Sequence, residues 1–179
     1  MNGALKLLST QTASNSASVS FTSGIDSTYN EYVFYFVDIN PATDTQKLTF
    51  QTSTDGGSSY AVNVTSTSFR ATNDEGGSGA EIIYDTGNDL ANSTSFNPLS
   101  GTIGNGADEC AAGELHLYLP SSTSLAKHWT STFNLYEASS YTVHQFNSGY
   151  FNTTSAINAI QFKMGSGNFD GNIYMFGVK

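Results

Sequence analysis

Three histidines, His116, His128 and His144, are the side chains whose unperturbed charge would change near neutral pH. None of them forms a His-x-His or His-x-x-x-His pair, so the sequence contains no spaced imidazole set for a metal ion. No Gly-x-Ser-x-Gly sequence is present to expose a serine nucleophile on a strained turn. We therefore interpret the histidines as surface or interface residues, and we expect that the protein is not an enzyme.

Carboxylates cluster weakly in three predicted loops, at Asp74 and Glu75, at Asp85 and Asp89, and at Asp108 and Glu109. Carboxylate and amide oxygens on loops are the ligands that Ca²⁺ uses, but the spacing here matches no EF-hand. A glycosidase would need two carboxylates held a few ångströms apart, which a sequence does not show. We favour solvated loop charges that aid solubility, with a structural Ca²⁺ ion as the alternative and no other cofactor.

Charge and hydropathy exclude several classes of partner. The net charge is -9, from 6 Lys and Arg against 15 Asp and Glu, and the cations are scattered, which argues against nucleic acid. No apolar run is long enough to span a bilayer, so we expect no membrane partner.

The start of the chain lacks the apolar region of a signal peptide, which predicts synthesis in a cytoplasm without a Sec signal of its own. Cys110 is the single cysteine, so an intramolecular disulfide is excluded.

Aromatic residues are abundant, whereas charged residues are few. The chain has 12 Phe, 10 Tyr and 1 Trp, and 12% of its residues are charged, against about a quarter in ordinary soluble proteins. Aromatic side chains are favoured at protein interfaces, so we expect a homo-oligomer; the alternative is that they fill a wide core. A set of aromatic residues expected to be exposed could stack on sugar rings, although subunit packing is the favoured use. These residues are Tyr118, Trp129, Tyr136, Tyr141 and Tyr150.

The elements that must position these residues are predicted to be strands. In the segment 29–40, Tyr32, Phe34 and Phe36 alternate with Val33, Tyr35, Val37 and Ile39. A strand that is apolar on both faces is normally covered on both faces. The pattern predicts a central strand, or a strand that faces a neighbouring subunit.

Other segments show alternation between turn residues, and no stretch of ten or more residues has a helical period. We predict hairpins between 47–52 and 60–65 around Asp55-Gly-Gly57, between 126–137 and 141–151, and between 159–164 and 172–179. Residues 85–109 are predicted to form a long surface connection. About ten strands predict an all-β protein, an antiparallel β-sandwich with jelly-roll-like connections. We expect one domain over residues 1–179, with 1–17 as an N-terminal arm or an edge strand.

Several segments resemble a known family. They include Asp38-Ile-Asn-Pro-Ala-Thr-Asp44, Gly113-Glu-Leu-His-Leu-Tyr-Leu-Pro-Ser-Ser-Thr123 and Asn172-Ile-Tyr-Met-Phe-Gly-Val-Lys179, together with 21–34, 103–109 and 149–167. These segments resemble small β-sandwich virion proteins of tailed bacteriophages, especially marine ones, over nearly the whole chain. The resemblance carries over no catalytic residue.

The resemblance implies a virion protein on the exterior of the particle, assembled in the cytoplasm of the host bacterium. The first expectation is a capsid decoration (cement) protein, commonly a trimer, that contacts the major capsid protein and other virion proteins. Its candidate contacts are the 32–39 strand, with Tyr32 and Tyr35, and the 5–8 arm, with Leu5 and Leu7. The alternative is a head-fibre or tail-fibre tip that binds glycans on the host cell surface.

Overall fold

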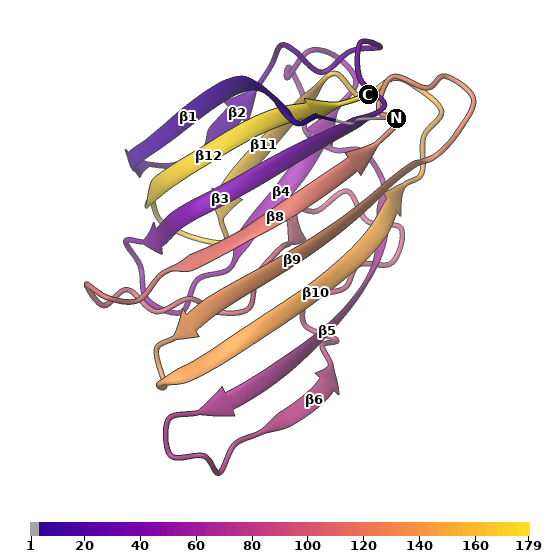
Figure 1. Ribbon diagram of the computed structural model, residues 1–179. Helices are drawn as coiled ribbons and strands as arrows, with labels where there is room; N and C mark the ends of the chain where they lie inside the picture. Colours follow the sequence, from indigo (N-terminus) through magenta and orange to yellow (C-terminus); the bar gives the residue numbers. More distant parts are fainter. Residues whose placement is uncertain (1–3) are drawn as a thin grey trace.

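The computed structural model describes residues 4–179, which fold into 12 strands in two antiparallel sheets (Figure 1). The strands are β1 (Lys6–Ser16), β2 (Val19–Phe21), β3 (Glu31–Pro41), β4 (Leu48–Ser53), β5 (Val64–Asp74), β6 (Glu81–Tyr84), β7 (Asn97–Pro98), β8 (Ala111–Tyr118), β9 (Lys127–Glu137), β10 (Tyr141–Phe151), β11 (Ala159–Met164) and β12 (Phe169–Val178). The large sheet has the order β1-β12-β3-β8-β9-β10-β5-β6, and the small sheet β2-β11-β4-β7. The predicted all-β sandwich is confirmed, with more strands than the ten expected.

Most strands that follow one another along the chain do not pair with each other. Only β5–β6, β8–β9 and β9–β10 are consecutive strands that pair with each other among the described residues. The predicted hairpin of 126–137 with 141–151 is therefore confirmed as β9 and β10, from Tyr141 opposite Glu137 to Phe151 opposite Lys127. Of the segment 1–17, residues 1–3 lie outside the described residues, and residues 4–17 contain β1, which pairs with β12 at the edge of the large sheet.

Two predicted hairpins are wrong. The 47–52 segment is β4, which pairs with β11 and β7 in the small sheet, whereas the chain after Asp55-Gly-Gly57 enters β5 of the large sheet. In the same way β11 and β12 belong to different sheets. Alternation shows which face of a strand is apolar, but it does not show which strand lies beside it.

An aromatic core joins the two sheets. Phe34 and Phe36 of β3 contact Phe162 of β11, with ring centroids 5.4 and 5.0 Å apart. Phe50 of β4 meets Trp129 of β9 at 4.9 Å in an edge-to-face arrangement, the geometry that the ring quadrupole favours. The prediction that the 29–40 segment contains a central strand is confirmed, since β3 lies between β12 and β8.

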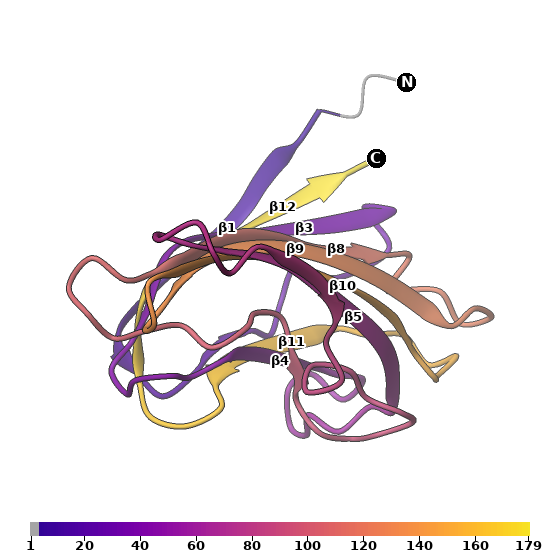
Figure 2. The same ribbon diagram turned by 90° about the horizontal axis from the view of Figure 1, so that it is seen from below.

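The large sheet arches over the small one (Figure 2). Its last four strands, β9, β10, β5 and β6, continue beyond β8 (Figure 1), and we call them the extension. Under β10 and β5 the inner face is covered by the connection 85–104: Asn147 donates to the Leu99 carbonyl and Ser66 to Asn97. Leu99, Ser100 and Ile103 are buried, so the expected surface connection is wrong for this part of the segment.

The Asp55 turn, which carries the chain from one sheet to the other, is held by a carboxylate. Ser53 Oγ donates to Asp55 Oδ1 (2.5 Å), and Ser59 donates its backbone N–H to Oδ1 (2.9 Å) and its hydroxyl to Oδ2 (2.6 Å). These hydrogen bonds, that of Ser53 foremost, stabilise the charged form and lower the pKa of Asp55 from 3.8 to about 2. The turn is thus tied to the ionised state of one side chain.

A pH titration tests this arrangement. Because the folded pKa is depressed, the stabilisation of the turn is fully present above pH 3.8 and is lost as the pH falls through about 2. We expect the Asp55 carboxyl ¹³C resonance and the Ser59 amide to titrate together near pH 2. In Asp55→Asn the Ser59 amide should lose this transition. A midpoint at 3.8 or above would contradict the hydrogen-bonded turn.

Residues 4–179 contain no helix that is long and apolar enough to cross a bilayer.

Candidate functional site

The outer face of the large sheet, turned away from the small sheet, carries all three histidines. His116, His128 and His144 lie on β8, β9 and β10, where they alternate with the buried residues Leu115, Leu117, Trp129 and Val143. His128 and His144 are exposed and His116 is partly exposed, so the surface prediction is confirmed. His116 Nδ1 lies 2.5 Å from Glu31 Oε1, and Nε2 lies 3.5 Å from Glu114 Oε1. Within residues 4–179, no three His, Cys, Asp or Glu side chains form a group suited to a metal ion.

An apolar patch lies on the outer face at the β1 end of the sheet. Leu7 is opposite Phe176 of β12, and the Phe176 ring contacts the Tyr35 ring of β3 edge-on at 5.4 Å. Leu5, which is two residues before Leu7, and Val37, which is two residues after Tyr35, are also exposed. We call these five residues the β1 patch. The fold thus brings together Leu5, Leu7 and Tyr35, three of the predicted contact residues.

The free edge of β1 borders this patch. β1 pairs with β12 on one side, and within the described chain no strand of the large sheet pairs with its other side. Of its 11 residues, KLLSTQTASNS, Lys6 alone is charged. Its register with β12 is continuous from Ser9 to Ala13, between two bulges. A long edge with few charges presents unpaired N–H and C=O groups to which another strand can bind.

A second surface lies on the outer face of the extension. Tyr150 of β10 is opposite His128 of β9, with ring centroids 6.1 Å apart. Four residues earlier on β10, Phe146 is opposite Phe69 of β5, and their rings stack in parallel at 4.8 Å. These two ring pairs border a groove that crosses the strands, which we call the aromatic groove.

Hydroxyl side chains form the floor of the aromatic groove. Ser148 of β10 lies opposite Thr130 of β9 on one side and Thr67 of β5 on the other. Two hollows of about 330 and 190 Å³ share these three residues, one reaching Tyr150 and the other Phe146. The groove is therefore continuous between its two aromatic walls, and its lining contains no Asp, Glu, Lys or Arg.

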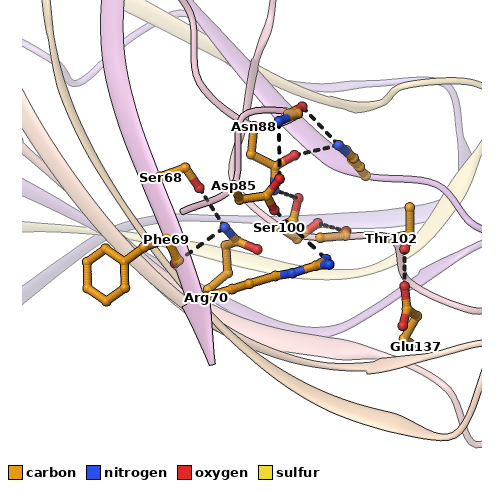
Figure 3. A network of polar contacts seen from close by, with 12 residues as sticks. Ser68, Phe69, Arg70, Asp85, Asn88, Ser100, Thr102 and Glu137 are labelled. Atoms are coloured by element: carbon orange, nitrogen blue, oxygen red, sulfur yellow. Dashed lines mark hydrogen bonds and ion pairs between the residues drawn. The ribbon is translucent and has the colours of Figure 1, made fainter. Parts of the chain in front are cut away.

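A buried polar network fixes the strands beneath this groove (Figure 3). Gln145 Nε2 donates to Ser68 Oγ (2.6 Å), Ser68 Oγ donates to Asn147 Oδ1 (2.7 Å), and Asn147 Nδ2 donates to the Leu99 carbonyl (2.8 Å). Figure 3 shows Phe69 on the opposite side of β5 from Ser68 and Arg70. Inward polar groups thus anchor the strands whose outward residues form the groove.

The network continues into the connection below. Asn88 donates to the Ser100 carbonyl (3.1 Å) and accepts a hydrogen bond from Lys47 Nζ (2.6 Å). Thr102 donates to Glu137 Oε1 (2.6 Å), and a 3.9 Å ion pair joins Arg70 to Asp85 (Figure 3). The last two contacts tie the segment 85–104 to β9 and β5 of the large sheet, and the Lys47 contact ties it to the residue that precedes β4.

Two predicted contact residues are not at the surface. Trp129 is 1% exposed and packs on Phe50, so the expectation that it is exposed is wrong. Tyr32 is 0% exposed: it faces the core, and its hydroxyl accepts from the Asp26 N–H and donates to the Asp26 carbonyl. Both residues lie on the inner face of a strand, and beside Trp129 the outward position is held by His128, which is exposed and lies opposite Tyr150.

The other predicted tyrosines lie apart from one another. Tyr118 OH is 3.2 Å from Thr130 Oγ1, beside the aromatic groove. Tyr136 lines a 420 Å³ pocket at the end of the extension and donates to Glu75 Oε1, whereas Tyr141 lines a separate pocket with Arg70 and Glu137. Sequence reasoning missed Phe69, Phe146 and Phe176 as surface residues. A signal for the first two is their alternation with Ser68, Gln145 and Asn147.

Comparisons with known proteins add little to this geometry. No protein-family model and no curated protein matches the chain. Among solved structures, it is similar to a structural-genomics protein of unknown function from Bacteroides ovatus, with a TM-score of 0.32 and 7% identity. That match covers 58% of this chain and 45% of the other, so the chain spans less than half the length of that protein. What the structure itself defines is an antiparallel β-sandwich with an exposed strand edge and two distinct outer surfaces.

Proposed function

We propose that the protein is a bacteriophage virion protein on the particle exterior, a capsid decoration protein that acts through protein-protein contact. The observation that carries the proposal is the β1 patch. Leu7, Phe176 and Tyr35 lie side by side on neighbouring strands that start at a free strand edge, and the exposed apolar residues Leu5 and Val37 stand at the two ends of this row. Exposed apolar residues that adjoin an open edge favour docking of another chain.

The partner is the major capsid protein, with self-association into a trimer as part of the same assembly. A strand added to the 9–13 part of β1 would gain backbone hydrogen bonds, while the patch would gain apolar burial. A decoration protein that binds only assembled capsid stabilises it by mass action. The resemblance to virion proteins supports a location on the capsid, and the β1 patch supplies a surface by which the protein attaches.

The strand order supports the proposal at the level of fold. We infer that β1-β12-β3-β8, facing β2-β11-β4-β7, is a jelly roll, to which β9, β10, β5 and β6 are added at one side. Jelly rolls are found in viral capsid and lectin domains. Since one fold serves many functions, the proposal depends on the β1 patch and not on the jelly roll alone.

Binding to particles that lack the protein tests the proposal. In the double variant Leu5→Asp, Leu7→Asp each substitution removes apolar burial of about 2 kcal/mol at the contact, so the two together should raise the Kd by roughly a thousandfold. Co-sedimentation with purified particles measures this, and their resistance to heat should fall accordingly.

Leu125→Asp is the matched control, because Leu125 is 53% exposed and Leu7 is 52% exposed. The control should bind as the unchanged protein does. If the double variant saturates the particles at the same concentration as the control, the β1 patch is not the attachment surface. If the unchanged protein does not bind and its removal leaves heat resistance the same, the decoration function is excluded.

A further inference from the structure

We propose that the aromatic groove of the extension binds a neutral oligosaccharide, at a site separate from the β1 patch. The proposal does not depend on the decoration function, because β3, β8 and β12 separate the groove strands from β1. The extension is made by strands added beyond β8, and its outer face has a composition different from that of the β1 patch.

The walls of the groove suit the apolar face of a sugar ring. Phe69 is 46% exposed and Tyr150 37% exposed, so substantial ring surface is open to solvent on each side. Both rings are held in place by a ring on the neighbouring strand, Phe146 and His128 respectively. Because each ring lies beside another ring, its rotation is restricted and less side-chain entropy is lost when a ligand packs against it.

The floor suits the hydroxyl groups of a sugar. Thr67, Thr130 and Ser148 each supply a hydroxyl that both donates and accepts. A row of hydroxyls between two rings offers hydrogen bonds and apolar contact at once, which is the mixture of surfaces that a pyranose presents.

The dimensions also fit a short oligosaccharide. Tyr150 and Phe146 are four residues apart on β10, so the two walls stand roughly 13 Å apart at the backbone. The floor crosses β9, β10 and β5 and is therefore roughly 10 Å long. The joined hollows of about 330 and 190 Å³ are large enough for a few sugar units in a row across the strands.

The charge of the site selects the class of ligand. The lining contains no Asp, Glu, Lys or Arg, and the imidazole of His128 is its one basic group, so no ammonium or guanidinium is present to pair with an acidic sugar. The net charge of -9 further disfavours uronic acids, sialic acids and nucleic acid at this surface. A protein partner or a second copy is the competing occupant, and the experiment below separates it from a sugar.

The test is a glycan array with neutral and acidic glycans, followed by ¹H–¹⁵N NMR titration with maltohexaose, laminarihexaose and chitohexaose. At least one neutral glycan should bind, and the amides of Thr67, Thr130 and Ser148 should shift during its titration. Tyr150→Ala should weaken binding by about tenfold through loss of one aromatic wall. Ser148→Trp should abolish binding by filling the floor.

Tyr174→Ala is the matched control, since Tyr174 lies on the same sheet but on β12, outside the groove. It should bind as the unchanged protein does. An array without neutral binders, or binding that survives both Tyr150→Ala and Ser148→Trp, would overturn the proposal. Groove amides that shift with protein concentration and not with any of the three sugars would assign the groove to a second copy instead.

Discussion

Trp129→Ala is expected to lower the free energy of unfolding by about 3–5 kcal/mol, the range for removing a large aromatic side chain from a core. The indole is 1% exposed and packs edge-on against Phe50. Its Nε1 has no hydrogen-bond partner among the described residues, so the penalty is one of lost packing. Gly149, opposite Trp129, leaves room for the ring: a Cβ there would lie 2.9 Å from indole Cζ2. Because Gly149 has no side chain that could move inward, it cannot fill the cavity that the Trp129→Ala substitution leaves.

Thermal and chemical denaturation measure the effect of this change. For a chain of this size the melting temperature should fall by roughly 10 °C. Tyr150→Ala is the control, because Tyr150 follows Gly149 on the same strand but faces outward, and its stability should change by about 0.5 kcal/mol or less. If Trp129→Ala stays as stable as this control, the indole is not part of the core.

The positions of the strands were predictable because inward-facing and outward-facing residue types alternate along the sequence. The segment 29–40 contains β3, and the 126–137 and 141–151 segments are β9 and β10. The short loop between β9 and β10 also fixed their pairing. Strand partners elsewhere were not predictable. Asp55-Gly-Gly57 is turn chemistry of a kind that serves a hairpin, yet here it leads from β4 of one sheet to β5 of the other.

The exposed surfaces were less predictable than the strands. In the extension, Ser68, Gln145 and Asn147 face inward while Phe69 and Phe146 face outward, the reverse of the usual pattern. The inner face there is covered by a connection with backbone carbonyls, such as that of Leu99, so amides and hydroxyls are the better partners. The alternation pattern alone would have predicted that the rings of Phe69 and Phe146 are buried.

The β1 patch was also only partly predictable from the sequence, because its residues come from distant segments. Leu7 and Tyr35 were predicted as contact residues, but Phe176, which lies between them, was not. Phe176 is more than 140 positions away from Tyr35 in the sequence, and only the strand order of the sheet brings the two side by side. Tyr32 and Tyr35 were both predicted as contact residues, from the two opposite faces of one strand. One of the two is therefore in the core.

Asn147→Leu is expected to destabilise the protein by about 2–4 kcal/mol, because it leaves several buried groups without partners. Asn147 accepts from Ser68 and donates to the Leu99 carbonyl and to Ser131 Oγ. Leucine has a similar size but can replace none of these hydrogen bonds.

The loss should be greatest in the extension, since Asn147 joins β10 to β5 and to the connection beneath them. Hydrogen exchange should therefore speed up in β5 and β10 more than in β3 and β12. Asn134→Leu is the matched control: Asn134 is an exposed asparagine on β9 that donates to Thr142, and its loss should cost about 1 kcal/mol or less. Equal losses in the two variants would mean that the buried network does not hold the extension. A larger loss at Asn147, with faster exchange in β5 and β10 than in β3 and β12, would show that the strands that carry Phe69, Phe146 and Ser148 of the aromatic groove are held by polar contacts on their inner face.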